Sequence, residues 1–124
     1  MAGKITFWEG NGATQNQVGN TLNGGANYNI DCKNGDHGFS NDEARSLRLE
    51  GIPGMTLIKV YDSPSASEGD DWAKIVIKGP IPGAVVVGSF NSSANLDGGN
   101  VVVTSYYKDG LDGKISKILI DYLE

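Results

Sequence analysis

The chain contains one cysteine, one histidine and four prolines, and it has no long run of apolar residues. A single cysteine cannot form a disulfide within the chain, so folding does not depend on an oxidising compartment. No segment approaches the ~20 apolar residues that a helix needs to cross a bilayer. These features exclude a disulfide-stapled scaffold. We therefore expect no membrane partner, and we expect no signal peptide at the N-terminus.

Basic side chains are also scarce. Ten Lys and Arg residues stand against fifteen Asp and Glu residues, which gives a formal net charge of -5. Nucleic-acid binding needs a basic face, so this balance argues against a nucleic-acid partner. The composition leaves location open and favours a cytosolic over a secreted protein. A length of 124 residues with eighteen glycines predicts one turn-rich domain, residues 1–124, with enough chain to bury a core.

Apolar and polar residues alternate in several short runs, and no long segment has the 3.6-residue period of a helix. This pattern predicts an all-β fold. Residues 10–29 are polar and are expected to be mostly loop, Asn34-Gly35 is typical of a hairpin turn, and a helical turn is expected at Asp42–Arg45. The expected strands include Lys4–Glu9, Ser46–Glu50, Thr56–Asp62, Trp72–Lys78, Ala84–Phe90 and Val101–Tyr107.

The two halves of the chain resemble each other. Trp8-Glu9 matches Tyr61-Asp62 with a shift of 53 residues, and Asn41 matches Asp112 with a shift of 71. The difference predicts an 18-residue insertion in the second half, placed at Ser63–Asp70 and Asn91–Asn100. Two four-stranded Greek keys, about residues 3–54 and 55–124, would pack as a sandwich.

Each half contains a polar loop that leads directly into an apolar strand, Phe39–Leu49 in the first and Gly110–Ile120 in the second. Together with the aromatic-acidic pairs, these loops resemble the calcium motif of the βγ-crystallin superfamily: two Asn/Asp, two free positions, Ser/Thr, then Ser. The small acidic chain also resembles the fungal perithecial type in that superfamily. The resemblance covers nearly the whole chain and implies a sandwich of two Greek keys. The aromatic-x-Gly pattern of the family is incomplete, because Val18-Gly19 lacks the aromatic residue.

The resemblance implies that calcium is held by both loops and by backbone carbonyls of the first strands. Calcium accepts carboxylate, hydroxyl and carbonyl oxygens together, which such loops can supply. Matching the motif position by position implies side-chain ligands and carbonyl ligands. The candidate metal residues are Glu9, Asn41, Asp42, Glu43, Asp62, Asp112, Lys114 and Ser116.

Both loops depart from the motif at one position. Arg45 stands where a hydroxyl ligand is expected, and Gly113 stands where a second Asn/Asp is expected. A pairing of Asp42 with Ser116 keeps both side-chain ligands, whereas a pairing of Gly113 with Arg45 loses both. A guanidinium about 4 Å from a divalent ion costs roughly 8 kcal/mol at an effective dielectric of 20. The sequence therefore predicts one good and one impaired calcium site.

Two other groups of residues are alternative candidates for a functional site. Cys32 and His37 lack an orienting partner and an oxyanion motif, so catalysis is not expected. Glu68, Asp70 and Asp71 form an acidic cluster that is either a solvated loop or a peripheral cation site. We interpret the chain as a monomeric, non-enzymatic calcium-binding protein with a structural or stress-type role. The alternative is a binding module of the same fold that recognises a carbohydrate, a cell wall or a protease.

Overall fold

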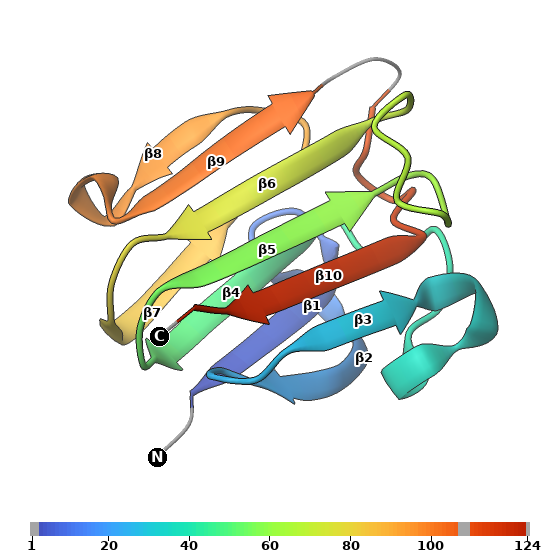
Figure 1. Cartoon of the computed structure of the whole chain (residues 1–124). Coiled ribbons are helices and arrows are strands. Elements are labelled where there is room, and N and C mark those ends of the chain that lie inside the picture. The colour runs from blue at the N-terminus through green and yellow to red at the C-terminus, as the bar shows by residue number, and fades with distance from the viewer. Residues whose placement is uncertain (1–2, 107–109, 124) are drawn as a thin grey trace.

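Two antiparallel sheets make up the molecule, as the computed structural model shows for residues 3–106 and 110–123 (Figure 1). The all-β prediction is confirmed. The predicted strand end at Tyr107 lies outside the described residues. The strands are β1 Lys4–Gly10, β2 Thr14–Asn23, β3 Tyr28–Asp31, β4 Ser46–Ile52, β5 Thr56–Tyr61, β6 Trp72–Ile77, β7 Ile81–Val87, β8 Ala94–Leu96, β9 Val101–Tyr106 and β10 Lys117–Tyr122.

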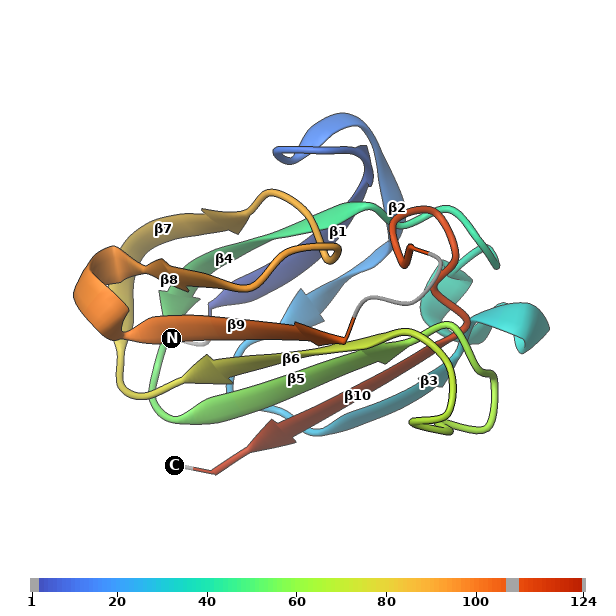
Figure 2. The same ribbon diagram turned by 90° about the horizontal axis from the view of Figure 1, so that it is seen from above.

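The two sheets face each other as layers (Figure 2). The four-stranded sheet has the order β2-β1-β4-β7, and the six-stranded sheet has the order β3-β10-β5-β6-β9-β8. Each sheet therefore contains one strand from the other half of the chain, β7 in the first and β3 in the second. This exchange ties the two halves together through backbone hydrogen bonds as well as through the core.

Each half is a Greek key whose third strand has moved to the opposite sheet. In the first half, β4 returns to lie beside β1, and in the second half β10 returns to lie beside β5. The predicted pair of Greek keys is present. The hairpin of β8 and β9 has no counterpart in the first half, so it accounts for much of the predicted insertion. It extends the six-stranded sheet beyond β6.

The core lies between the sheets and consists of the inward-facing residues of both. Three phenylalanines gather at its centre: Phe7 contacts Phe39 edge-to-face at 5.4 Å between ring centroids and Phe90 at 6.2 Å. All three are buried. Phe39 packs directly over Gly19, where φ is +74° and a Cβ would collide with the ring. An aromatic ring thus covers this glycine, although it comes from a residue twenty positions further along the chain.

Three local predictions were wrong. Residues 14–23 form the edge strand β2, although only Val18 and Leu22 are buried in it. A bulge opposite β1 separates these two residues by four positions, which hides the period of two. Residues 32–38 form two 3-10 turns, Cys32–Asn34 and Asp36–Gly38, rather than a hairpin. Asp42 has a φ of +62°, which rules out the expected helical turn at Asp42–Arg45.

A third 3-10 turn, Asp97–Gly99, connects β8 to β9. Among the described residues, no helix is long and apolar enough to cross a membrane. The proposed domain limits, residues 1–124, remain a prediction.

Candidate metal centre

The two polar loops lie side by side and hydrogen-bond to each other reciprocally. The Asp42 amide donates to the Ile115 carbonyl at 3.2 Å, and the Gly113 amide donates to the Ala44 carbonyl at 2.9 Å. Each bond is the counterpart of the other under the shift of 71 residues. The contact therefore relates the two loops by an approximate two-fold axis, and Asp42 takes the position that Gly113 takes in the second loop.

A second pair of bonds attaches each loop to the first strand of its own half. The Arg45 amide donates to the Trp8 carbonyl, and the Ser116 amide donates to the Tyr61 carbonyl, both at 2.8 Å. Arg45 thus corresponds to Ser116, and Trp8 corresponds to Tyr61. The residues after these aromatics, Glu9 and Asp62, are brought next to the loops. The register inferred from the sequence is the register of the hydrogen bonds.

One side of the loop pair is rich in oxygen. Ser116 is buried just before β10. The hydrogen bond from its backbone amide to the Tyr61 carbonyl places it beside Asp62. Burial is the main cause of the raised pKa of the Asp62 carboxyl, with a further contribution from Asp70. Lys114 lowers that pKa, while the charges of Asp71 and Asp42 raise it further. The charges of Asp42 and Lys114 thus both act on Asp62, and Ser116 is connected to the same segment through its hydrogen bond to Tyr61.

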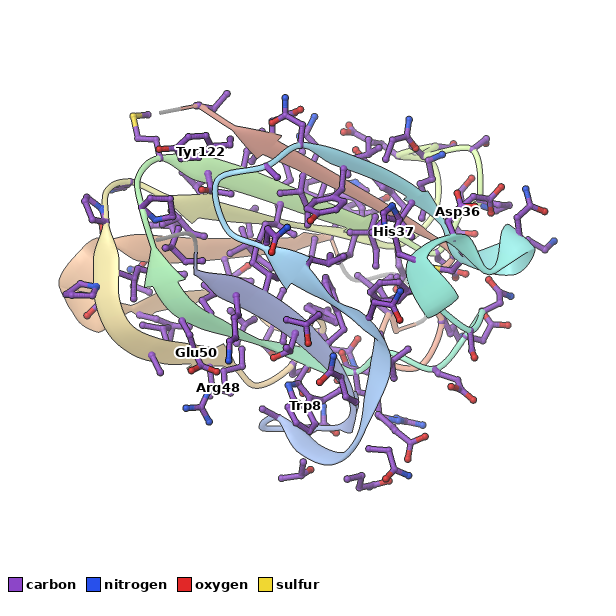
Figure 3. All side chains as sticks on the ribbon, turned by 90° about the horizontal axis from the view of Figure 1, so that it is seen from below. Trp8, Asp36, His37, Arg48, Glu50 and Tyr122 are labelled. Atoms are coloured by element: carbon purple, nitrogen blue, oxygen red, sulfur yellow. The ribbon has the colours of Figure 1, made fainter. Side chains whose placement is uncertain are left out.

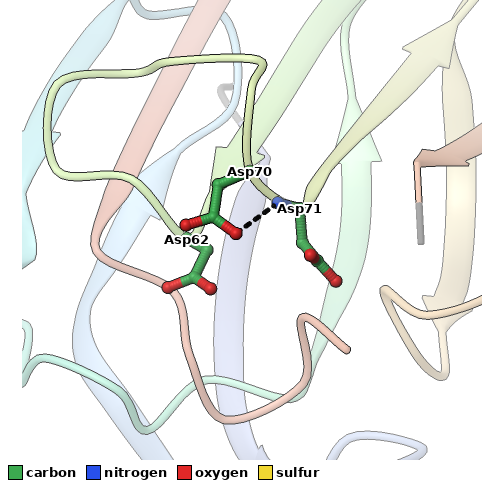
Figure 4. Close-up of side chains that lie close together, drawn as sticks. All are labelled: Asp62, Asp70 and Asp71. Atoms are coloured by element: carbon green, nitrogen blue, oxygen red, sulfur yellow. Dashed lines mark hydrogen bonds between the residues drawn. The ribbon is translucent and has the colours of Figure 1, made fainter. Parts of the chain in front are cut away.

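Asp62 also belongs to an acidic cluster with Asp70 and Asp71 (Figure 4). One carboxylate oxygen of each lies within 4.8 Å of the others. The loop between β5 and β6 folds back on itself: the Asp62 amide donates to the Asp71 carbonyl at 3.0 Å, and the Asp71 amide donates to Asp70 Oδ1 at 3.0 Å. Asp71 is fully buried and accepts a hydrogen bond from the Gly110 amide at 2.6 Å. The cluster thus connects the β5–β6 loop to the second polar loop.

The membership of this cluster differs from the sequence-based expectation. Glu68 is not a member, because it pairs with Lys74 at 3.3 Å on the outer side of β6. Asp62 takes its place. The sequence separation of Asp62 from Asp70 concealed this, because only the return of the β5–β6 loop brings the two together.

The other side of the loop pair carries a cation of its own. A Cβ built on Gly113 would lie 3.1 Å from Arg45 Nη2 and 3.2 Å from Arg45 Cζ. The guanidinium therefore covers the face of Gly113 from which a side chain would project. Gly113 has a φ of +79°, so the position matches Asp42 in backbone conformation and differs in lacking a side chain. This side offers no carboxylate where the first loop offers Asp42.

The carboxylate of Asp112 is already engaged with three donors. Oδ2 accepts hydrogen bonds from Asn11 Nδ2 at 2.7 Å and from the Ser89 hydroxyl at 2.6 Å, and Oδ1 accepts one from the Phe90 amide at 2.7 Å. Asp112 thus joins three segments that are distant in sequence. Its side chain positions the second loop.

Asn41, the counterpart of Asp112, is bound quite differently. Its Oδ1 is a buried atom without a hydrogen-bond partner among the described residues. The remaining predicted residues lie at the loop surface: Glu43 and Lys114 are exposed, and Glu9 accepts a hydrogen bond from Asn16 Nδ2 at 3.1 Å. Of the predicted set, the structure gathers Asp42, Asp62, Lys114 and Ser116 on one side, and it places Glu9 beside Arg45.

A hollow of about 460 Å³ is found away from this centre, on the outer face of the four-stranded sheet. Figure 3 shows Trp8, Arg48 and Glu50 along this face, directed away from the second sheet. The hollow exists because small residues line it, with Lys4 and Glu50 at its rim. None of the predicted metal residues contributes to it.

The chain is an all-β sandwich of two Greek keys, and the third strand of each key lies in the opposite sheet. No protein-family model matches the chain, and no curated protein matches it. Among solved structures, the chain is similar to the crystal structure of the N-terminal domain of protein S. The two share 15% sequence identity at a TM-score of 0.48, and the match covers 97% of each chain. Nothing about the ligands of this chain follows from a likeness at that level.

Proposed function

We propose that the chain is a non-enzymatic calcium-binding protein that binds one calcium ion on the Asp42 side of the loop pair. Asp42 supplies a carboxylate, Ser116 a hydroxyl, and Lys114 and Asp62 backbone carbonyls. The resemblance of the two loops to the βγ-crystallin motif is the reason to choose calcium. Oxygen donors of mixed kind, drawn from separate segments, suit a cation that takes six to eight ligands in flexible geometry.

The observation that carries the proposal is the asymmetry between two loops with the same backbone register. On the Asp42 side, acidic groups accumulate: burial is the main cause of the raised pKa of Asp62, and the charges of Asp70, Asp71 and Asp42 raise it further. On the other side, Arg45 covers Gly113. Mutual repulsion among carboxylates is relieved when a divalent cation binds between them. Buried Asn41 Oδ1, next to Asp42 in the chain, is a further acceptor oxygen without a protein donor.

Three residues of the predicted ligand set do not bind the ion in this proposal. Asp112 positions the second loop, because its carboxylate already accepts three hydrogen bonds. Glu9 and Glu43 belong to the side that Arg45 occupies, and their carbonyls bind no ion there. The bound ion stabilises the fold: at a hundred times its dissociation constant it adds about 2.7 kcal/mol to the free energy of unfolding.

Asp42→Asn tests the proposal. Asparagine tolerates the left-handed backbone at this position, so the variant loses a negative charge and keeps the loop. Calorimetric titration of EDTA-treated protein should show one calcium ion per wild-type chain and at least about tenfold weaker binding by the variant, or about 1.4 kcal/mol.

Asp97→Asn is the matched control. Asp97 is also exposed and left-handed, with a φ of +53°, but it lies in the β8–β9 hairpin. It should bind calcium as the wild type does. Wild-type affinity in Asp42→Asn would place the ion elsewhere, and a wild-type protein that binds no calcium at millimolar concentration would refute the proposed function.

A further inference from the structure

No other described element covers the outer face of the six-stranded sheet, which Figure 1 shows from the front. The inward positions of its central strands are filled by buried residues such as Ile58 and Ile75, so the alternate positions face outward. The strand register aligns the residues at these positions in three rows across β5, β6 and β9: Tyr61, Trp72 and Tyr106; Lys59, Lys74 and Thr104; Leu57, Val76 and Val102. Tyr61 is buried, so the first row is open only at Trp72 and Tyr106.

The first row ends in an aromatic pair, half-buried Trp72 and exposed Tyr106. The rings of Trp72 and Tyr106 are stacked, with centroids 5.6 Å apart and planes inclined by 14°. Tyr106 remains 44% exposed. Lys74 Nζ lies 4.8 Å from the centroid of the Trp72 ring, which holds the indole in place through a cation–π contact. A preordered aromatic surface of this kind, apolar with polar tips, is characteristic of binding faces.

The second row carries two lysines as direct cross-strand neighbours, Lys59 on β5 and Lys74 on β6. Like charges in this position destabilise a sheet. Lys74 is compensated by Glu68 at 3.3 Å and by Trp72. Among the described residues, Lys59 has no ion pair. Although the net charge of the chain is -5, this face carries Lys59, a lysine without an ion pair in the described part of the chain, in the row next to the aromatic pair.

The geometry points to an acidic polysaccharide, a chain of uronate sugars, as the ligand of this face. A pyranose ring offers an apolar C–H face that can stack on Tyr106 and Trp72, and its carboxylate can reach the ammonium group of Lys59. A second copy of the chain is disfavoured, because a two-fold contact across this face would oppose the lysines to each other. This site does not depend on the proposed calcium centre.

Affinity electrophoresis in gels that contain polygalacturonate tests the inference, with gels that contain a neutral cellulose derivative as the comparison. EDTA is present throughout, so that calcium cannot bridge protein and polymer. The wild type should be retarded by polygalacturonate alone. Tyr106→Ser and Lys59→Gln should each weaken that retardation at least about fivefold, and added salt should weaken it too. Val86→Ser, an exposed change on the outer face of the other sheet, should have no effect.

Several outcomes would overturn the inference. One is a wild type that migrates equally in both gels. Another is retardation that survives both substitutions while the variants keep the wild-type melting temperature. Tighter binding of a single-stranded oligonucleotide than of polygalacturonate would assign the face to nucleic acid. Concentration-dependent dimerisation that Lys59→Gln strengthens would assign it to a second copy.

Discussion

The two polar loops share a backbone and differ in charge. Both lead into the last strand of their half, both use a left-handed residue at the second motif position, and each donates a hydrogen bond to the other. At that left-handed position one loop has Asp42 and the other has Gly113. The backbone geometry of the loop pair is therefore retained although one of the two positions lacks a carboxylate.

The residue types at positions 45 and 113 depend on each other. The guanidinium of Arg45 lies where a Cβ of residue 113 would be 3.1 Å from its nitrogen. Any side chain at position 113 would force Arg45 to move. Glycine at this position therefore leaves room for the guanidinium of Arg45 where it now lies, and the arginine places a positive charge on the Gly113 side of the loop pair.

The first-position residues should give the largest contrast. Asp112→Ala removes the acceptor for three donors that join Asn11, Ser89 and Phe90 to the loop, so it should lower the free energy of unfolding by about 2–4 kcal/mol. Asn41→Ala should change it by less than about 1 kcal/mol, because Oδ1 has no donor to lose. Urea denaturation in EDTA measures both. Equal losses in the two variants would mean that the loops are anchored alike.

Restoring the Arg45 side of the loop pair should give the next largest effect. Arg45→Ser with Gly113→Asp returns a hydroxyl and a carboxylate to the Arg45 side, and the calcium stoichiometry should rise from about one towards two. Saturation of the new site at a hundred times its dissociation constant should add about 2.7 kcal/mol. Calorimetry at low salt measures both quantities.

The single variants of this pair are its controls. Gly113→Asp alone should bind no second ion, since its side chain would meet Arg45 at a backbone φ of +79°. Arg45→Ser alone should supply most of the gain, because removing the positive charge relieves the larger repulsion. A folded double variant that still binds the wild-type number of ions would refute the pairing of these two positions.

The sequence predicted the relations that depend on matched spacing. The shift of 71 residues reappears in the reciprocal hydrogen bonds, and the pairing of Arg45 with Gly113 agrees with their contact. The alternation of apolar and polar residues predicted most strands, because it too depends only on spacing along the chain. The sequence missed β2, because a bulge places its two buried residues, Val18 and Leu22, four positions apart.

Other features could not be predicted because they depend on contacts between distant segments. The three donors to Asp112 come from two segments, at Asn11 and at Ser89-Phe90, that only the folded chain brings to it, so its motif position suggested a ligand. Likewise, Asp62 joins Asp70 and Asp71 only because the β5–β6 loop returns to its starting point. The identity of a bound ion is not determined by the fold, and the proposal of calcium therefore depends on the motif and on titration.

The smallest effect should be a pH dependence confined to the Asp42 side. Burial and the neighbouring carboxylates raise the pKa of Asp62 above its ordinary value of 3.8. At a pH between the ordinary pKa and the raised pKa, Asp62 holds a proton in the folded chain and has released it in the unfolded chain. The free energy of unfolding should therefore fall as pH rises through this window, with a slope that corresponds to at most one bound proton.

Denaturation of the calcium-free protein across this range of pH should show the slope. Asp62→Asn should reduce it, whereas Glu9→Gln, the counterpart beside Arg45, should keep it because Asp62 remains. Saturating calcium should abolish it, since a bound divalent cation favours the ionised carboxylate. A slope unchanged in Asp62→Asn would assign the proton to another group and remove this electrostatic distinction between the two sides.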